Sequence, residues 1–242
     1  MSRDRRRWLG LAGMAAFGSL VAQMETSRAI GAEKEKKDEG EEVEAAEDLM
    51  REHGVLRRAL LVYSEAASRL SSGQGEVSPD ALSKTAALFR RFGEDYHERS
   101  LEEQHVFPVL RQQGGRNATL TNVLKQQHDR GREITDYIIA VTRGGRIGTA
   151  DAKPLASALL PFVRMYEHHT AIEDTVIFPA WKAAIAKSQY QELSEQFEDL
   201  EHRMFGKDGF EDAVEQIGVI EQAFGLADLS KLTAPAPPKP AA

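Results

Sequence analysis

The sequence predicts an all-α fold, and two features of its 242 residues support this expectation. Apolar residues recur at helical spacing along most of the chain, and almost no segment alternates between apolar and polar residues as a strand does. Glycine and proline stand where helices would end and begin. The predicted helices span about residues 44–71, 78–106, 119–143, 154–178, 188–205 and 209–224, and the fourth either ends at Phe178 or continues past Pro179.

Capping residues set the limits of these helices. The first helix is ended by Ser72 and Gly73, and the third is closed by Gly144 and Gly145. The second begins with Ser78 and Pro79, because proline is tolerated at the first helical position. It should end at Val106, since the residue before Pro108 is pushed out of helical geometry. The connections are short, so neighbouring helices should run antiparallel.

The composition excludes several classes of function. The chain has 38 acidic against 31 basic residues and a net charge of −7, and it is more acidic still beyond residue 32, so nucleic acid is not an expected partner. It contains no cysteine, which excludes disulfides, iron–sulfur clusters and thiol nucleophiles. Any bound metal must therefore be held by nitrogen and oxygen atoms.

Residues 1–32 have the pattern of a signal peptide. Several arginines precede a weakly apolar, uncharged run, and small residues follow it. The paired Arg6 and Arg7, followed by Trp8 and Leu9, resemble the twin-arginine signal, which directs the export of folded proteins. We expect a periplasmic protein without a stable membrane span after cleavage. The alternative is a membrane anchor formed by an uncleaved N-terminus.

Each of the first four predicted helices carries a histidine at a matching depth. His53 lies about 18 residues before the end of the first helix, and His97 lies about 18 residues after the start of the second. His97 and His128 match in the same way, and so do His128 and His169. Because a helix rises 1.5 Å per residue, the four rings should lie at one level of the bundle.

The neighbours of two of these histidines indicate that the rings face inward. Leu49 and Leu56 lie on the same helical face as His53, and His169 lies on an apolar face with Glu173 four residues later. A lone inward histidine is more often a core residue than a ligand. A buried carboxylate, however, needs a compensating cation or strong donors, so four histidines at one depth with Glu173 favour a metal site.

The sequence also resembles a known family. The resemblance rests on the segments DLMREHGVLRRALLVY, EDYHERSLEEQHVFPVL, LKQQHDRGREITDYI and MYEHHTAIEDTVIFPAW, which are similar to the hemerythrin-like, or HHE cation-binding, family. The segment EHRMFGKDGFEDAVEQIGVIEQAFGLADL resembles a C-terminal extension of a bacterial branch of that family. The similarity implies an up-and-down four-helix bundle over residues 45–186 with additional C-terminal helices over 187–232. A charged linker (33–44) and a disordered, proline-rich tail (233–242) would flank them.

The resemblance implies a non-haem centre of two iron ions (Fe²⁺/Fe³⁺), capped by histidines and bridged by two carboxylates. The matching positions are His53, His97, His128, His169 and Glu173. Nitrogen and oxygen ligands also suit manganese and zinc, so iron rests on the resemblance alone.

The second helix departs from the family pattern, which places a glutamate four residues after the histidine. Here Leu101 stands at that position, and Glu102 stands five residues after His97. A one-residue π-bulge would bring Glu102 back to the face of His97. Alternatively Glu98 is the ligand, or both glutamates are. We favour Glu102, because it is in register with the VFP that follows.

The third helix departs as well. Arg132 stands four residues after His128, where oxygen-carrying hemerythrins have a second histidine. One ion should then have fewer ligands, take another carboxylate, or recruit His202 from the C-terminal extension. The remaining histidines, His105 and His168, are not expected to be ligands.

These observations lead to one expected function and two alternatives. We expect a di-iron protein that binds or senses O₂ or NO, or holds iron, in the periplasm. The first alternative is a di-iron oxidoreductase, either a ferroxidase or a peroxide-reducing enzyme. The second is a metal-free helical interaction module. The sequence contains no nucleophile and base pair, phosphate-binding loop or nucleotide fingerprint.

Overall fold

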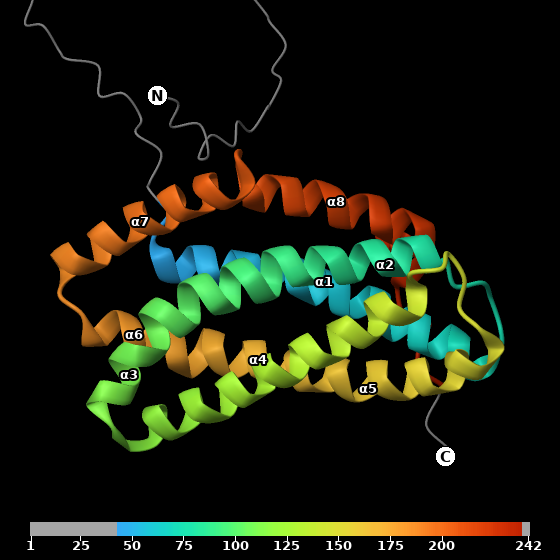
Figure 1. Ribbon diagram of the computed structural model, residues 1–242, viewed down its shortest axis with the longest axis horizontal. Coiled ribbons are helices and arrows are strands. Elements are labelled where there is room, and N and C mark those ends of the chain that lie inside the picture. The colour runs from blue at the N-terminus through green and yellow to red at the C-terminus, as the bar shows by residue number, and fades with distance from the viewer. Residues whose placement is uncertain (1–42, 239–242) are drawn as a thin grey trace, which may run out of the picture. The chain divides into compact units, whose positions relative to one another are not determined.

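A computed structural model describes residues 43–238, and within them every regular element is a helix. Figure 1 shows their arrangement. The elements are α1 (Ala45–Ser72), α2 (Pro79–Leu88), η1 (Phe89–Val106), α3 (Phe107–Gln113), α4 (Gly115–Thr142), α5 (Thr149–Ile172), η2 (Glu173–Ile177), α6 (Phe178–Ala184), α7 (Lys187–Phe205), α8 (Gly209–Phe224) and η3 (Leu229–Leu232). The predicted all-α fold is confirmed.

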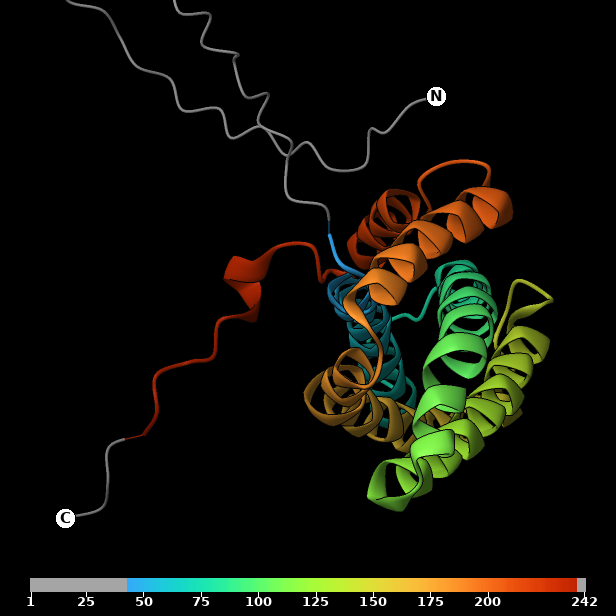
Figure 2. The ribbon, with the colours of Figure 1, turned by 90° about the vertical axis from the view of Figure 1, so that its left-hand side faces the viewer.

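The elements up to α6 form four long rods. α1 and α4 are single helices, whereas the second rod joins α2, η1 and α3, and the fourth joins α5, η2 and α6. Successive rods run in opposite directions, as the short connections predict (Figure 1). The rods form a bundle, and α7 and α8 follow each other end to end along its outside, against α1 and the second rod (Figures 1 and 2).

The extension α7–α8 is tied to α1 by hydrogen bonds. Glu44, at the N-cap of α1, provides no side-chain cap, so the first backbone N–H groups of the helix need other acceptors. Ala45 N–H donates to Ser194 Oγ at 3.1 Å, and Ala46 N–H donates to the hydroxyl of Tyr190 at 2.8 Å. Both acceptors lie on α7, which therefore caps α1 from outside the bundle.

The predicted caps of the first two helices are confirmed. Gly73 adopts φ 66°, a left-handed conformation that favours glycine, and its N–H donates to the carbonyl of Arg69. Ser78 accepts a hydrogen bond from the N–H of Ala81 at 3.2 Å, and Pro79 opens the helix.

The prediction that the second rod ends at Val106 is wrong. Val106 stays helical at φ −89° and ψ −58°, and the rod continues through α3. The wide turn of η1 closes with a bond from Phe107 N–H to the carbonyl of Glu102, five residues earlier. Pro108 then lies in the first turn of α3, where its missing N–H leaves no bond broken.

Other helix limits differ by a few residues. α4 begins at Gly115 rather than near residue 119, and α5 begins at Thr149 rather than near Pro154. The fourth rod passes Pro179 and ends at Ala184, which is the longer of the two predicted alternatives. None of the described helices is long and apolar enough to cross a membrane.

The proposed domain limits stay predictions. The predicted signal peptide and nearly all of the linker lie outside the described residues, as does the end of the predicted tail.

Candidate metal centre

Six buried side chains converge at the middle of the bundle, and all four rods contribute to them. They are His53 on α1, His97 and Glu102 on η1, His128 on α4, His169 on α5 and Glu173 on η2. Each is at most 2% exposed. These are the six residues that the sequence favours as metal ligands, and the structure brings all of them together.

The histidines meet in two pairs through their Nε2 atoms. His53 Nε2 lies 2.9 Å from His97 Nε2, and His128 Nε2 lies 3.1 Å from His169 Nε2. The first pair joins α1 to η1, and the second joins α4 to α5. The matching depths predicted from the helix limits are therefore confirmed.

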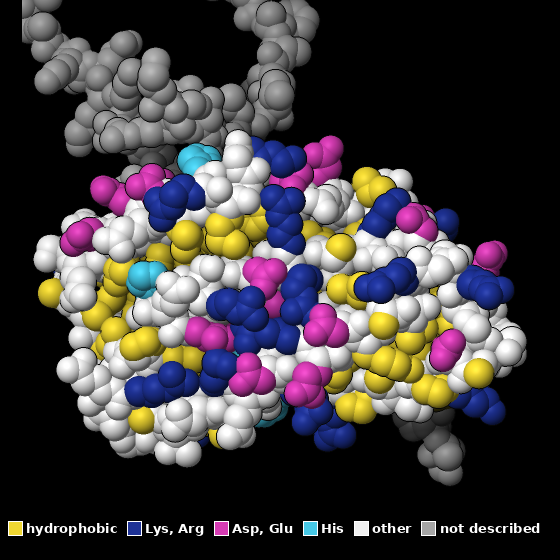
Figure 3. Space-filling model, in the orientation of Figure 1, with side chains coloured by type: hydrophobic (Ala, Val, Ile, Leu, Met, Phe, Trp, Pro, Cys, Tyr) yellow, Lys and Arg dark blue, Asp and Glu magenta, His cyan; other side chains and the backbone are white. Residues whose placement is uncertain are grey.

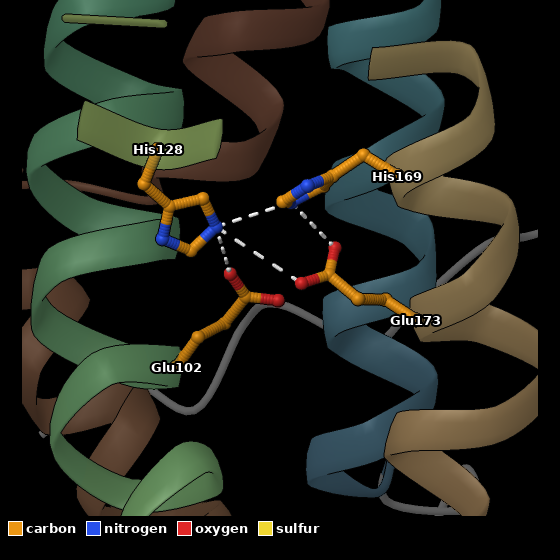
Figure 4. Close-up of side chains that lie close together, drawn as sticks. All are labelled: Glu102, His128, His169 and Glu173. Atoms are coloured by element: carbon orange, nitrogen blue, oxygen red, sulfur yellow. Dashed lines mark hydrogen bonds and ion pairs between the residues drawn. The ribbon is translucent and has the colours of Figure 1, made fainter. Parts of the chain in front are cut away.

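The two glutamates lie between the pairs. Glu102 Oε1 is 3.4 Å from His97 Nε2, and its Oε2 is 3.3 Å from His128 Nε2. Glu173 Oε2 lies 3.0 Å from His169 Nε2 and 3.4 Å from His53 Nε2. Figure 4 shows both carboxylates directed at the second pair. Each carboxylate thus reaches a histidine of both pairs, as a bridging ligand of two ions would.

The wide helix η1 explains why Glu102 can face the same way as His97. Over Phe89–Val106 the helix is a π-helix, in which backbone hydrogen bonds run over five residues, so positions five apart lie on nearly the same face. The hydroxyl of Ser100 follows the same spacing and donates to the carbonyl of Asp95 at 2.7 Å. The structure thus has π-helical geometry between His97 and Glu102, but it extends over Phe89–Val106 and is not the one-residue bulge considered from the sequence.

An oxygen acceptor holds the outer nitrogen, Nδ1, of each of these four histidines. Each acceptor comes from a neighbouring rod, and each is adjacent in sequence to one of the six central residues. The contacts are His53 Nδ1 to Asp174 Oδ1 (2.7 Å), His97 Nδ1 to Glu52 Oε2 (2.7 Å), His128 Nδ1 to Glu103 Oε1 (3.0 Å) and His169 Nδ1 to Gln127 Oε1 (2.8 Å). The four contacts form a closed ring around the bundle. We call these four acceptors the outer ring.

The outer ring fixes which nitrogen of each histidine is free for a metal. An oxygen acceptor at Nδ1 requires that this nitrogen carry the proton, which leaves the lone pair on Nε2. Two lone pairs about 3 Å apart repel each other unless a proton or a cation lies between them. In the described part of the chain, none of the carboxylate oxygens of Glu102 and Glu173 accepts a hydrogen bond. Buried, unsatisfied acceptors of this kind fit divalent cations.

Without a cation, the facing histidines His128 and His169 have pKa values shifted in opposite directions. Burial alone would lower the pKa of His128, but the carboxylates of Glu98, Glu102 and Glu103 outweigh it and raise the pKa to about 10. Burial and the charge of His128 lower the pKa of His169 to about 3. At neutral pH these pKa values leave His128 protonated and the facing His169 neutral.

The carboxylates are affected as well. Burial and the charge of Glu102 raise the pKa of Glu173 to about 7. Burial also opposes the charged form of Glu102, but the nearby His97 and His128 outweigh it and hold the pKa of Glu102 well below its usual range. The two carboxylates thus have opposite pKa shifts, and a positive ion between them would compensate the negative charge of both.

Comparison with protein families agrees with this geometry. The model of the hemerythrin HHE cation-binding domain matches residues 44–181, which contain the whole cluster and its outer ring. The chain belongs to the hemerythrin HHE cation-binding family.

A comparison with individual proteins finds relatives whose names give no function. The chain is 45% identical over 192 residues to uncharacterized proteins of Mycobacterium tuberculosis and Mycobacterium bovis, covering 79% of this chain and 74% of theirs. No solved structure matches the chain.

Two phenylalanines cover the hemerythrin site on opposite sides. Phe178 stacks on the ring of His53 with centroids 5.3 Å apart, and Phe107 stacks on His128 at 5.4 Å. Both are fully buried, and both immediately precede the prolines that restart a regular helix after a wide one. They separate the cluster from solvent at this end of the bundle.

Arg132 does not face the Nε2 atoms, although it stands where oxygen-carrying hemerythrins have a histidine. Its guanidinium Nη2 lies 3.1 Å from Glu98 Oε2 and 2.5 Å from Glu103 Oε1. The hydroxyl of Tyr166 donates to the other oxygen of Glu98 at 2.7 Å. Glu98 approaches only the outer nitrogen of His128, at 3.9 Å. The structure therefore brings Glu102 to the Nε2 atoms and holds Glu98 in a separate polar layer.

Two further histidines lie at the surface. His202 is exposed on α7, next to the backbone carbonyl of Lys207, and is not part of the cluster. His168 is exposed beside the buried His169, as its position on the helix predicts. His105 is partly buried and packs on Phe197.

Sequence reasoning missed the outer ring. Asp174, Glu52, Glu103 and Gln127 do not follow the apolar stripes that mark the inward faces. The sequence does contain one signal for them, because each is next in sequence to one of the six central residues. A residue next to an inward ligand is turned about 100° from it and points toward the neighbouring rod.

Proposed function

We propose that this protein holds two iron ions between its four buried histidines and binds a diatomic ligand, O₂ or NO, at that centre. The observation that carries the proposal is the pairwise approach of four Nε2 atoms to two shared carboxylates. Membership of a cation-binding family supports a metal at this place. Iron is preferred over manganese or zinc because of the hemerythrin relationship, since the donor atoms suit all three.

Two groups of side chains would hold the ions. His53 and His97 would hold one ion and His128 and His169 the other, with both glutamates shared. The outer ring would keep each imidazole neutral, oriented and proton-free at Nε2. Two ferrous ions held in this way would supply one electron each, which O₂ could take on binding and return on release.

The surroundings favour reversible binding. Phe107 and Phe178 keep water from the histidines, and an apolar wall slows the delivery of protons to a reduced ligand. The guanidinium of Arg132 donates to Glu98 and Glu103 and so does not approach the Nε2 atoms.

The alternative of a di-iron oxidoreductase has weaker support. Such chemistry would be favoured by an additional carboxylate at the centre, and Glu98 is the nearest candidate. Tyr166 and Arg132 hold both oxygens of Glu98 away from the Nε2 atoms. We therefore place oxidoreductase activity second.

Purification of the protein in air, followed by metal analysis and optical spectroscopy, tests the proposal. We expect two iron ions per chain and visible charge-transfer absorption that changes reversibly when the reduced protein meets O₂ or NO. Protein stripped by a chelator serves as the control. Less than one ion per chain after reconstitution with ferrous iron would contradict the proposal. Irreversible consumption of O₂ or peroxide over many turnovers would favour the oxidoreductase.

We further propose that the protein acts in the periplasm. The paired Arg6 and Arg7 and the apolar run after them support export. Replacement of both arginines by lysine should retain the protein in the cytoplasm. Equal amounts of both forms in the periplasm would contradict this proposal.

A further inference from the structure

The outer ring is not uniform, although it surrounds the centre completely. Three of its four members are carboxylates, and Gln127 is a neutral amide. A carboxylate that accepts the Nδ1 proton makes the imidazole a stronger metal ligand than an amide does, because it shares the proton more fully and adds negative charge. The difference falls on His169 alone.

Two members of the outer ring, one behind each histidine pair, are closely similar, so they contribute little to a difference between the two pairs. Asp174 behind His53 and Glu103 behind His128 are both carboxylates with exposed fractions of 17% and 15%. Each also pairs with an arginine, Arg57 and Arg132 respectively.

The surface near Glu103 adds a small difference in the same direction. Basic and acidic side chains interleave on the face formed by η1 and α4 (Figure 3). Lys125 Nζ lies 3.7 Å from the second oxygen of Glu103, so two cations share this carboxylate. Its bond to His128 is correspondingly longer, at 3.0 Å against 2.7 Å for Asp174 and His53.

The remaining two members differ in kind. Glu52 behind His97 is fully buried, and no partner in the described part of the chain bonds to its second oxygen, Oε1. Its carboxylate therefore lies beside the His53–His97 pair without an arginine or lysine of residues 43–238 bonded to it and without screening by solvent. Gln127 behind His169 is only partly buried and carries no charge. Within the outer ring, the His53–His97 pair thus has two carboxylates behind it and the His128–His169 pair has one. Glu98 also lies 3.9 Å from His128 Nδ1, but Arg132 pairs with it and offsets its charge.

We infer that the two metal positions are unequal. The position between His53 and His97 binds a divalent cation more tightly, the position between His128 and His169 releases it more readily, and Glu52 and Gln127 are the positioning residues that set this order. The inference rests on the proposed two-ion site. It is independent of which diatomic ligand binds there.

Calorimetric titration of the metal-free full chain with Zn²⁺, in competition with a chelator, tests the inference without involving redox chemistry. We expect two binding steps of different affinity. His97→Ala should remove the tighter step, and His169→Ala should remove the weaker one. The Glu52→Gln variant should weaken the tighter step by about 10- to 100-fold, the usual effect of changing the acceptor behind a metal-binding histidine.

Gln127→Glu provides the complementary test, because it adds the missing carboxylate at a partly exposed position. It should strengthen the weaker step by about tenfold or more and bring the two steps together. Gln126→Glu is the matched control, since it adds the same charge on the exposed neighbour of Gln127 and should change either step by less than about twofold. Circular dichroism would verify that each variant keeps its helices.

Several outcomes would overturn the inference. They are two steps of equal affinity, loss of the tighter step in His169→Ala, or Gln127→Glu affecting binding no more than Gln126→Glu does. A wild-type chain that takes up no Zn²⁺ and no ferrous iron would instead refute the proposed function itself.

Discussion

Glu102 stands five residues after His97, yet its Oε1 atom lies 3.4 Å from His97 Nε2. In a regular α-helix, positions five apart are turned 140° from each other, so the two side chains would diverge. The wide turns of η1 remove this divergence. The local helix type, and not a change of ligand, therefore adapts this chain to the hemerythrin site.

Removal of Glu173 should empty both metal positions. Its carboxylate reaches a histidine of each pair, so Glu173→Ala removes a ligand from both ions at once. We expect the metal content to fall from two ions per chain to less than about half an ion. His168→Ala is the control, because His168 is exposed, and it should keep both ions. Equal metal contents in the two variants, measured by elemental analysis, would contradict the assignment of Glu173.

Gly131 should not tolerate a methyl group. A Cβ atom at this position would lie 2.0 Å from the hydroxyl oxygen of Tyr166, which is buried and bonded to Glu98. Gly131→Ala should lower the free energy of unfolding by about 1–3 kcal/mol through overpacking.

Gly54 on α1 is the matched control for this substitution. It is also inside a helix, but nothing lies within 4 Å of its added Cβ. Gly54→Ala should raise the free energy of unfolding by about 0.5–1 kcal/mol. Denaturant titration measures both effects, and effects of the same sign would show that the contact with Tyr166 is unimportant.

Glu94 should make the metal-free protein less stable as the pH rises. Burial and the neighbouring Glu98 raise its pKa from 4.5 to about 7, against opposing effects of Thr135, Arg90 and Arg132. Its contribution to stability is complete below pH 4.5 and is lost as the pH rises through 7, because the folded chain binds the proton more tightly.

The Glu94→Gln variant should remove this loss. Its free energy of unfolding should exceed that of the wild type by up to about 3 kcal/mol at pH 8, and the two should converge near pH 5. Asp95→Asn, at a partly exposed neighbour, should change stability by less than about 0.5 kcal/mol at either pH. Parallel pH profiles for the wild type and Glu94→Gln would refute the prediction.

Arg132 should be needed because it neutralises buried Glu98. Its Nη2 lies 3.1 Å from a carboxylate that is only 1% exposed. Arg132→Met should therefore cost about 3 kcal/mol, since it leaves a buried charge without its cation. Adding Glu98→Gln should recover much of that cost, and thermal unfolding of the single and double variants measures it. No recovery in the double variant would show that Arg132 acts mainly through Glu103.

Much of this centre could be predicted because its inner residues follow helical periodicity. His53 and His169 lie on apolar stripes, and the helix lengths place the four histidines at one depth. Glu102 needed the family register as well, because regular helical geometry turns it away from His97. The extent of the π-helical stretch depends on tertiary packing and leaves no local signature.

The outer ring and the caps of α1 could not be read from periodicity. Glu52 and Asp174 resemble solvent-facing residues in the sequence, and only the neighbouring rod turns them into acceptors of imidazole protons. In the same way, Ser194 and Tyr190 cap α1 across nearly 150 residues of sequence. Contacts of this kind depend on how rods pack, so no single segment encodes them.

The capping of α1 by α7 also has a consequence for biosynthesis. The helix that carries His53 is the first described element to leave the ribosome, but its N-terminal N–H groups find their acceptors only when residues 190–194 have been made. Arg58 on α1 likewise donates to Glu221 at 2.8 and 2.6 Å, and Glu221 is synthesised later still. His53 is therefore synthesised early, whereas the residues of α7 and α8 that hold its helix in place are synthesised last. A chain truncated before α7 would emerge with all six central residues but with a frayed α1, and metal loading should follow the completion of synthesis.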